Sequence, residues 1–187
     1  MLAIPIPSRQ GKNLWKTESD DRKRLDAFYY WAAAHYIHKD VTSKNVEDLE
    51  FNDPSEIARS LSELSYEERQ KYTSLSAFAL SGCDGKLNLC HPTAFAEVIR
   101  RALFDKARAE IFPNVRVRYM SSGTSPGMFL WPVWVLGKHA ENPEPFCGPG
   151  AEKARDVKFV NQKEGNHFIF WENPEKAIQQ YKGCINL

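Results

Sequence analysis

The sequence predicts a mixed α/β fold, a class in which helices and strands alternate along the chain. Its second half alternates helix, strand, helix, strand and helix, which is typical of a parallel sheet with crossover helices. Two short apolar runs, starting at Val115 and Val157, supply the strands, while the first half is mostly helical. With 187 residues, of which 42% are hydrophobic and 26% charged, we expect one domain that buries a core.

The first helix is expected after residues 1–18, which read as an extended, proline-punctuated segment. Ser19 or Asp20 can cap its start, and we expect it to end around His38–Asp40. Its apolar residues recur at helical spacing; they are Leu25, Phe28, Tyr29, Ala32, Ala33 and Tyr36.

Two further helices and a hairpin are predicted before residue 92. Asp53-Pro54-Ser55-Glu56 begins a helix, because proline is tolerated in a first turn. Ser65 and Glu68 form a capping box for a short helix that runs to about Leu75. Alternating runs in 78–81 and 87–90, on either side of Asp84-Gly85, predict a β-hairpin.

The predicted core follows in the order expected of a strand–helix–strand unit. Residues 92–112 have the periodicity of a long helix, and 115–120 read as a strand. A small-residue loop, 121–127, leads to an aromatic helix over 128–139. Residues 141–150, with three prolines and two glycines, are expected to form a loop.

The last strand and its loop carry the most informative residue of the chain. Val157–Val160 is followed by Glu164-Gly165-Asn166-His167-Phe168, and a final helix is expected over 174–182. A histidine placed on a loop after a strand, with a glycine to free the turn, has the layout that a general base needs. His167 is therefore the candidate catalytic residue. His35, His38, His91 and His139 are interpreted as structural, the first two on a helix surface.

Composition excludes several classes of function. The net charge is +1 and the basic residues are interspersed with acids, so nucleic acid is not an expected partner. No apolar run is long enough for a membrane span, and the start lacks the pattern of a signal peptide. The four cysteines have no metal-binding spacing, so no metal or other cofactor is expected and a cytoplasmic location is favoured. The final Ile185-Asn186-Leu187 only weakly matches a peroxisomal signal.

Taken together, three segments resemble the C-terminal half of an α/β-hydrolase of the epoxide-hydrolase, lipase or esterase type. These are 77–92, with its Asp-Gly turn, 115–127, which is similar to the penultimate core strand and its loop, and 155–171, which is similar to the last strand and the catalytic-histidine loop. The resemblance covers about residues 20–183. It implies a partial α/β-hydrolase fold, in which a helical cap segment precedes the last parallel strands and helices of the core.

The resemblance also implies an activity, namely serine-type hydrolysis of ester, thioester or lipid acyl bonds without a cofactor. Residues 1–92 would hold the extended segment, the cap remnant and the hairpin, and 93–187 the C-terminal part of the core. In this family the order of the catalytic residues is Ser, Asp or Glu, then His, and only His167 matches. The nucleophile elbow lies before the cap, so we expect this chain to be truncated and catalytically incomplete.

Gly123-Thr124-Ser125-Pro126-Gly127 nevertheless spells the G-x-S-x-G motif of a nucleophile elbow. Pro126 lacks the backbone N–H that would serve as an oxyanion donor, and losing one donor costs about 10²–10³ in rate. The segment 121–127 also contains no acid. We therefore favour a loop over a nucleophile at Ser125; Asp156 lies in the right order for the acid, whereas Glu164 is expected to face solvent.

Two alternatives remain open at the level of sequence. The chain could be a non-catalytic binding protein, because two parallel strands leave an unpaired edge that a homo-oligomer or an N-terminal hydrolase half would cover. It could also be an incomplete gene product. The aromatic residues are interpreted as core packing rather than as an acyl pocket; they are Phe129, Trp131, Trp134, Phe168 and Trp171.

Overall fold

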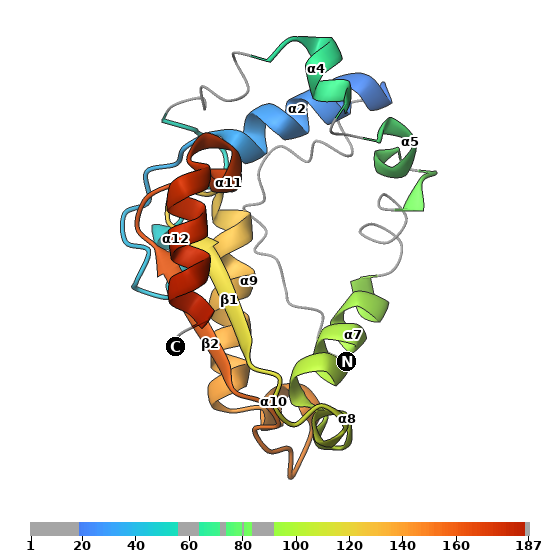
Figure 1. Cartoon of the computed structure of the whole chain (residues 1–187), viewed down its shortest axis with the longest axis vertical. Helices are drawn as coiled ribbons and strands as arrows, with labels where there is room; N and C mark the ends of the chain where they lie inside the picture. The colour runs from blue at the N-terminus through green and yellow to red at the C-terminus, as the bar shows by residue number, and fades with distance from the viewer. Residues whose placement is uncertain (1–18, 56–63, 72–73, 80, 84–91, 186–187) are drawn as a thin grey trace.

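The computed structural model describes residues 19–55, 64–71, 74–79, 81–83 and 92–185, arranged as in Figure 1. In chain order the elements are α2 (Asp21–Ala33), the 3₁₀ turn η1 (Val46–Asp48), α4 (Tyr66–Lys71), α5 (Leu75–Phe78), α7 (Pro92–Phe104), α8 (Lys106–Ile111), β1 (Val117–Ser122), α9 (Gly127–Glu141), α10 (Glu144–Cys147), β2 (Val157–Gln162), α11 (Ile169–Glu172) and α12 (Pro174–Ile185). Across this described part of the chain, every helix is too short or too polar to cross a bilayer.

The two strands form a parallel pair, which confirms the predicted α/β class and strand direction. The register runs from Val117 opposite Val157 to Ser122 opposite Gln162. Helix α9 connects the strands, as a parallel connection requires. Both strands end two residues later than expected, at the loops that carry the candidate site.

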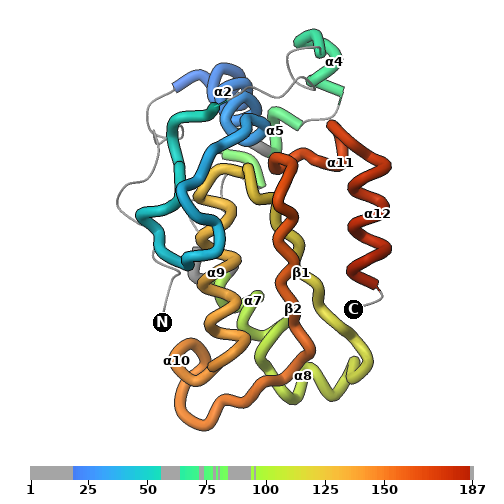
Figure 2. Tube along the Cα trace, turned by 90° about the vertical axis from the view of Figure 1, so that its left-hand side faces the viewer, coloured from blue at the N-terminus to red at the C-terminus, as the bar shows by residue number. Residues whose placement is uncertain are grey.

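Helices lie on both sides of this strand pair. Figure 2 shows β1 and β2 between α9 and α12. On the α9 side, Phe104, Ala140 and Val157 form a buried cluster, against which Val117 and Phe159 pack. The fold therefore has three layers here, with the carboxyl ends of both strands directed toward α2 and α11 (Figure 1).

Helix α2 begins as predicted but ends early. The Asp20 carboxylate accepts hydrogen bonds from the N–H groups of Arg22 and Lys23, which confirms the N-cap. The helix ends at Ala33 rather than at 38–40, because the Tyr36 N–H donates to Thr124 O at 2.9 Å and draws the chain out toward the sheet. Consequently His35 and His38 do not lie on a helix surface, and that prediction was wrong.

Of the other predictions before residue 92, one is confirmed and one is wrong. Ser65 and Glu68 form the capping box at the start of α4, with bonds of 2.8 and 3.2 Å. The described residues of the first hairpin run, Phe78, Ala79 and Ser81, are not in a strand. Phe78 instead ends the helical turn α5, which Ser74 caps by accepting from the Ala77 N–H. The second hairpin run, His91 and most of the helix expected from Asp53 lie outside the described residues.

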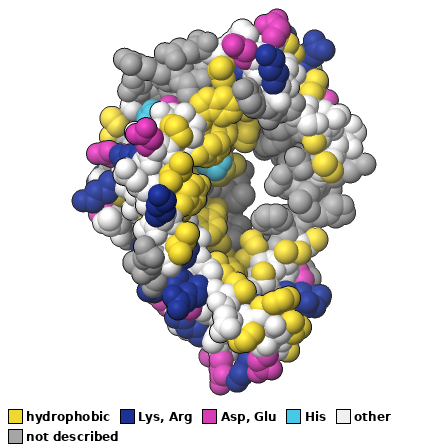
Figure 3. Space-filling view, in the orientation of Figure 1, with side chains coloured by type: hydrophobic (Ala, Val, Ile, Leu, Met, Phe, Trp, Pro, Cys, Tyr) yellow, Lys and Arg dark blue, Asp and Glu magenta, His cyan; other side chains and the backbone are white. Residues whose placement is uncertain are grey.

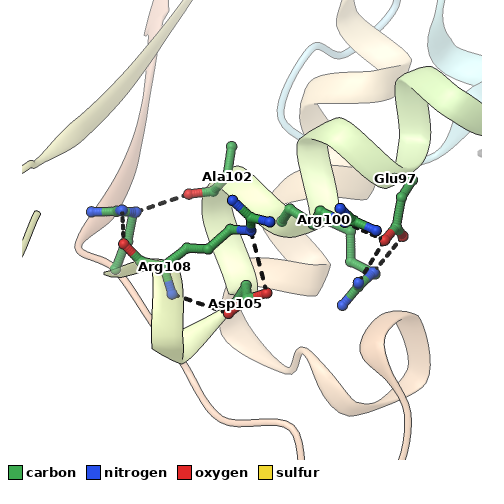
Figure 4. Close-up of polar contacts among 7 residues, drawn as sticks. Glu97, Arg100, Ala102, Asp105 and Arg108 are labelled. Atoms are coloured by element: carbon green, nitrogen blue, oxygen red, sulfur yellow. Dashed lines mark hydrogen bonds and ion pairs between the residues drawn. The ribbon is translucent and has the colours of Figure 1, made fainter. Parts of the chain in front are cut away.

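The helix predicted over 92–112 is divided into α7 and α8 at Asp105, whose side chain accepts from the Arg108 N–H and starts a new helix. Figure 4 shows this cap beside Glu97, which pairs with Arg100 on α7. The guanidinium of Arg155 donates to three carbonyl oxygens of this region, those of Ala102, Arg108 and Phe112. Helix α10 occupies part of the loop predicted over 141–150.

Candidate functional site

The candidate base, His167, lies on the loop between β2 and α11, at the carboxyl ends of the parallel strands. Ligands of parallel sheets bind at this edge. Gly165 enables the turn, because its φ of +99° belongs to a region that side chains disfavour, and a Cβ there would overlap Ile169. The carbonyl oxygen of Gly165 accepts from Thr124 Oγ1 at 2.8 Å, which fixes the loop to the end of β1.

The imidazole of His167 packs against aromatic rings. It stacks on Phe129, with ring centroids 3.9 Å apart and planes 6° from parallel, and the Phe168 ring meets it edge-on. Within the described residues neither nitrogen makes a hydrogen bond. The residue is exposed, yet partial burial of the ring lowers the pKa of His167, so the ring is uncharged at neutral pH.

Ser125 is placed for packing rather than for attack. It is 2% exposed, and its N–H donates to Ser122 O at 3.0 Å, so this amide is not free to bind an oxyanion. Among the hydrogen bonds within the described chain, none joins Ser125 to His167. The motif glycines allow close backbone approach, since a Cβ on Gly123 or Gly127 would lie 2.8 Å from a carbonyl oxygen.

The two candidate acids do not reach His167. Asp156 precedes β2, at the other end of the strand, and binds Arg118 at 2.9 Å. That hydrogen bond lowers the pKa of Asp156. Glu164 forms an ion pair with Lys176 and is exposed, as expected. No carboxylate within the described residues therefore orients the candidate base.

A second histidine links three segments at the same edge. His35 Nδ1 is 2.9 Å from Thr124 Oγ1, and its Nε2 is 3.3 Å from the Glu172 carboxylate. Carboxylate, imidazole and hydroxyl thus follow one another as in a catalytic relay. However, the N–H groups of Thr124 and Ser125 both donate to backbone carbonyls, so neither can stabilise an oxyanion. The chain of bonds therefore holds the loops together.

His38 fixes the segment after α2 to the β1–α9 loop. Its Nε2 donates to Ser125 O at 2.8 Å, and its Nδ1 accepts from the Glu50 N–H at 2.9 Å. These partners select the tautomer with its proton on Nε2. Burial lowers the pKa of His38 against the opposing effects of the Ser125 carbonyl and Glu50.

Asn166, like His35 and His38, has a role at this edge that was not predicted from the sequence. It is fully buried beside His167, with 0% exposure. Its Nδ2 donates to Ala33 O at the end of α2, and its Oδ1 accepts from the Phe168 N–H at 2.9 Å. The signal in the sequence was local, because asparagine often bonds the backbone two residues on and so closes a turn.

The aromatic residues divide between core and site. Trp131 and Trp134 pack with Leu49, Phe51 and Leu130, as the core interpretation predicts, whereas Phe129 serves as the platform for His167. Trp171 is partly exposed. In the described segments, no three histidine, cysteine or acidic residues gather closely enough to hold a metal ion.

Comparison with known proteins adds no assignment: no family model, curated protein or solved structure matches this chain.

Proposed function

We propose that this chain carries the general base of an acyl hydrolase of the α/β-hydrolase type. His167 is that base, and the attacking serine hydroxyl comes from outside the described residues. The proposal is supported by one observation above all: an exposed imidazole with a lowered pKa, at the carboxyl edge of a parallel strand pair, whose nitrogens make no hydrogen bond to the described residues. The substrate class is a small ester, thioester or lipid acyl compound.

The proposed chemistry needs one proton acceptor that later becomes a donor. His167 takes the proton of the serine hydroxyl as the serine oxygen bonds to the acyl carbon. It then returns this proton to the leaving oxygen, or to the leaving sulfur of a thioester, as the bond from the acyl carbon to the leaving group breaks. Water then repeats the sequence and releases the acid. Positioned acid–base catalysis of this kind contributes about 10²–10⁴ in rate. The depressed pKa of His167 favours the neutral ring that the first step requires.

An activated ester tests the base without its missing partner. Purified chain mixed with p-nitrophenyl acetate should release p-nitrophenolate at a rate that rises as the ring deprotonates, because a neutral, accessible imidazole attacks such esters directly. His167→Gln should bring the rate close to background. His139→Gln is the matched control, since His139 also stacks on an aromatic ring, that of Phe146, and also has a pKa lowered by burial.

Two results would contradict this function. A rate of p-nitrophenolate release unchanged by His167→Gln would exclude His167 as the base. Turnover of an unactivated ester that is lost in both Ser125→Ala and His167→Ala would show instead that the chain is a complete hydrolase with its own nucleophile.

The second candidate function is non-catalytic, namely binding of a second copy of this chain. It is favoured by the strand pair: within the described residues, β1 has β2 as its one strand neighbour. Figure 3 also shows hydrophobic side chains along a hollow between the sheet-bearing part and α7. A strand edge without a neighbour presents backbone N–H and C=O groups to which a strand of another chain can bind. The oligomeric state tests this candidate.

A further inference from the structure

His167 is the central residue of a turn that a buried side chain closes. Asn166 Oδ1 accepts from the Phe168 N–H at 2.9 Å, so the hydrogen-bonded ring of this Asx turn spans His167. A turn closed in this way fixes the backbone of its middle residue and hence the direction of the Cα–Cβ bond. The imidazole of His167 therefore starts from a defined direction.

The turn is anchored to a distant part of the molecule. The Asn166 amide group donates to Ala33 O, the carbonyl at the end of α2, and the side chain is fully buried. A buried amide has to satisfy both its donor and its acceptor, and here one end binds α2 and the other closes the turn. These partners also decide which side-chain atom is oxygen and which is nitrogen.

The ring plane of His167 is set at a second point. Phe129, in the first turn of α9, lies 3.9 Å from it and almost parallel. A ring held only by stacking would slide, whereas a ring with a fixed Cα–Cβ direction and a stacking platform has one orientation. With the edge-on Phe168 ring beside it, the imidazole keeps both nitrogens free of hydrogen bonds to the described residues.

We propose that Asn166 is the positioning residue of His167: its Asx turn, anchored on Ala33 at the end of α2, holds the imidazole on Phe129 with both nitrogens available. The catalytic meaning of this arrangement rests on the function proposed above. The geometry itself does not, because it concerns the orientation of one ring. Asn166 acts through His167 and does not touch the reacting atoms.

Histidine ring protons, observed by NMR on the full chain, test the proposal. The wild-type signals of His167, assigned through their loss in His167→Gln, should be displaced upfield by the stacked Phe129 ring. Asn166→Ala removes both hydrogen bonds, so the signals should move downfield toward those of an exposed histidine. The titration midpoint of His167 should rise toward 6.5 at the same time. Asn166→Asp keeps the acceptor for the Phe168 N–H, and while its buried carboxyl is protonated the O–H can donate to Ala33 O, so under those conditions the upfield displacement should persist.

The matched control is Asn173→Ala. Asn173 also accepts a backbone hydrogen bond through its side chain, from the Lys176 N–H at 2.9 Å, but it caps α12 and does not span His167. Its loss should leave the His167 signals unchanged.

Each outcome decides. Unchanged His167 signals in folded Asn166→Ala, loss of the upfield displacement in Asn166→Asp, or an equal change in Asn173→Ala would overturn the proposal. If Asn166→Ala does not fold, Asn166→Asp alone decides. The NMR readout needs no ester. An inert His167 in the ester assay would therefore exclude the proposed function but not the positioning by Asn166, and unchanged NMR signals in Asn166→Ala would exclude the positioning but not the proposed function.

Discussion

Among the histidines at the carboxyl edge of the strands, His38 is held in its neutral form by hydrogen bonds at both ring nitrogens. Its neutral ring is both donor and acceptor, and protonation of Nδ1 would break the bond from the Glu50 N–H. Burial lowers the pKa of His38 below the 6.5 of a free side chain. A base whose folded pKa is depressed contributes fully to stability above the unfolded value, and that contribution is lost as the pH falls through the folded pKa.

His38→Ala should therefore lower the free energy of unfolding at pH 7.5 by about 1–3 kcal/mol, because it leaves the Ser125 carbonyl and the Glu50 N–H without their partner. The difference in the free energy of unfolding between wild type and His38→Ala should be smaller at pH 5, where the His38 ring of the wild type is closer to protonation. Urea unfolding at both values measures it, with the exposed Ile37→Ala as the neighbouring control. An equal loss at both pH values would contradict the neutral assignment.

The position of His167 on a loop after the last strand could be predicted from sequence, whereas the residues that surround it could not, for a physical reason. The strand, the glycine and the loop that place His167 are contiguous, so a local pattern indicates them. His35 and His38 obtain their roles from Thr124 and Ser125, 89 and 87 residues away. The local periodicity predicted a helix that included both histidines, because a local pattern contains no information about the distant β1–α9 loop.

Among the elements, the predictions that succeeded rest on local chemistry. Asp20 and the Ser65–Glu68 box cap helices as their sequences indicate. In the described part of the first hairpin run two local signals competed, and the Ser74 cap outweighed the alternation of the residues after it. Asp105, inside an apparently continuous helix, is a similar cap that periodicity concealed.

The β2–α11 loop has a conformation that one substitution can test. Gly165 and Gly148 both have a φ of +99°, but a Cβ on Gly165 would overlap the Ile169 side chain, whereas nothing lies within 4 Å of one on Gly148. Gly165→Ala should therefore be the more destabilising change, by about 1–3 kcal/mol, the usual cost of overpacking. Paired urea unfolding curves measure the difference, since both positions have the same positive φ, which an alanine adopts only with strain. Equal losses would show that Ile169 moves aside freely.

At the scale of the whole molecule, the edge of β1 that faces away from β2 has the largest consequence, because no other strand of the described residues pairs with it. The N–H groups of Val117 and Gly123 donate to Asp156 O, just before β2, and to Gln162 O, at its end, at 2.9 and 2.6 Å. Strand alternation directs the N–H groups of the odd-numbered residues between them toward β2 as well. The even-numbered residues, Met120 among them, direct their N–H groups away from β2. An unpaired row of this kind is a template for another strand.

If the second candidate function holds, light scattering coupled to size-exclusion chromatography should show a mass that rises toward twice 21.4 kDa with concentration. Met120→Pro should weaken this association, because it removes an outward N–H and no backbone hydrogen bond to β2. The contact of Gln162 Nε2 with Met120 Sδ, at 3.8 Å, is lost in this variant and in the control alike. Met120→Ala, which keeps the N–H, is the control. A monomer at every concentration would exclude self-association through this edge.

The bond from Asn166 to Ala33 joins positions 133 residues apart. Bringing such distant positions together is entropically costly and slows folding. During synthesis, α2 leaves the ribosome before Asn166 has been made, so the carbonyl of Ala33 lacks this partner until 133 further residues have been added. The contact between the end of α2 and the loop after β2 therefore forms only after both strands have been synthesised.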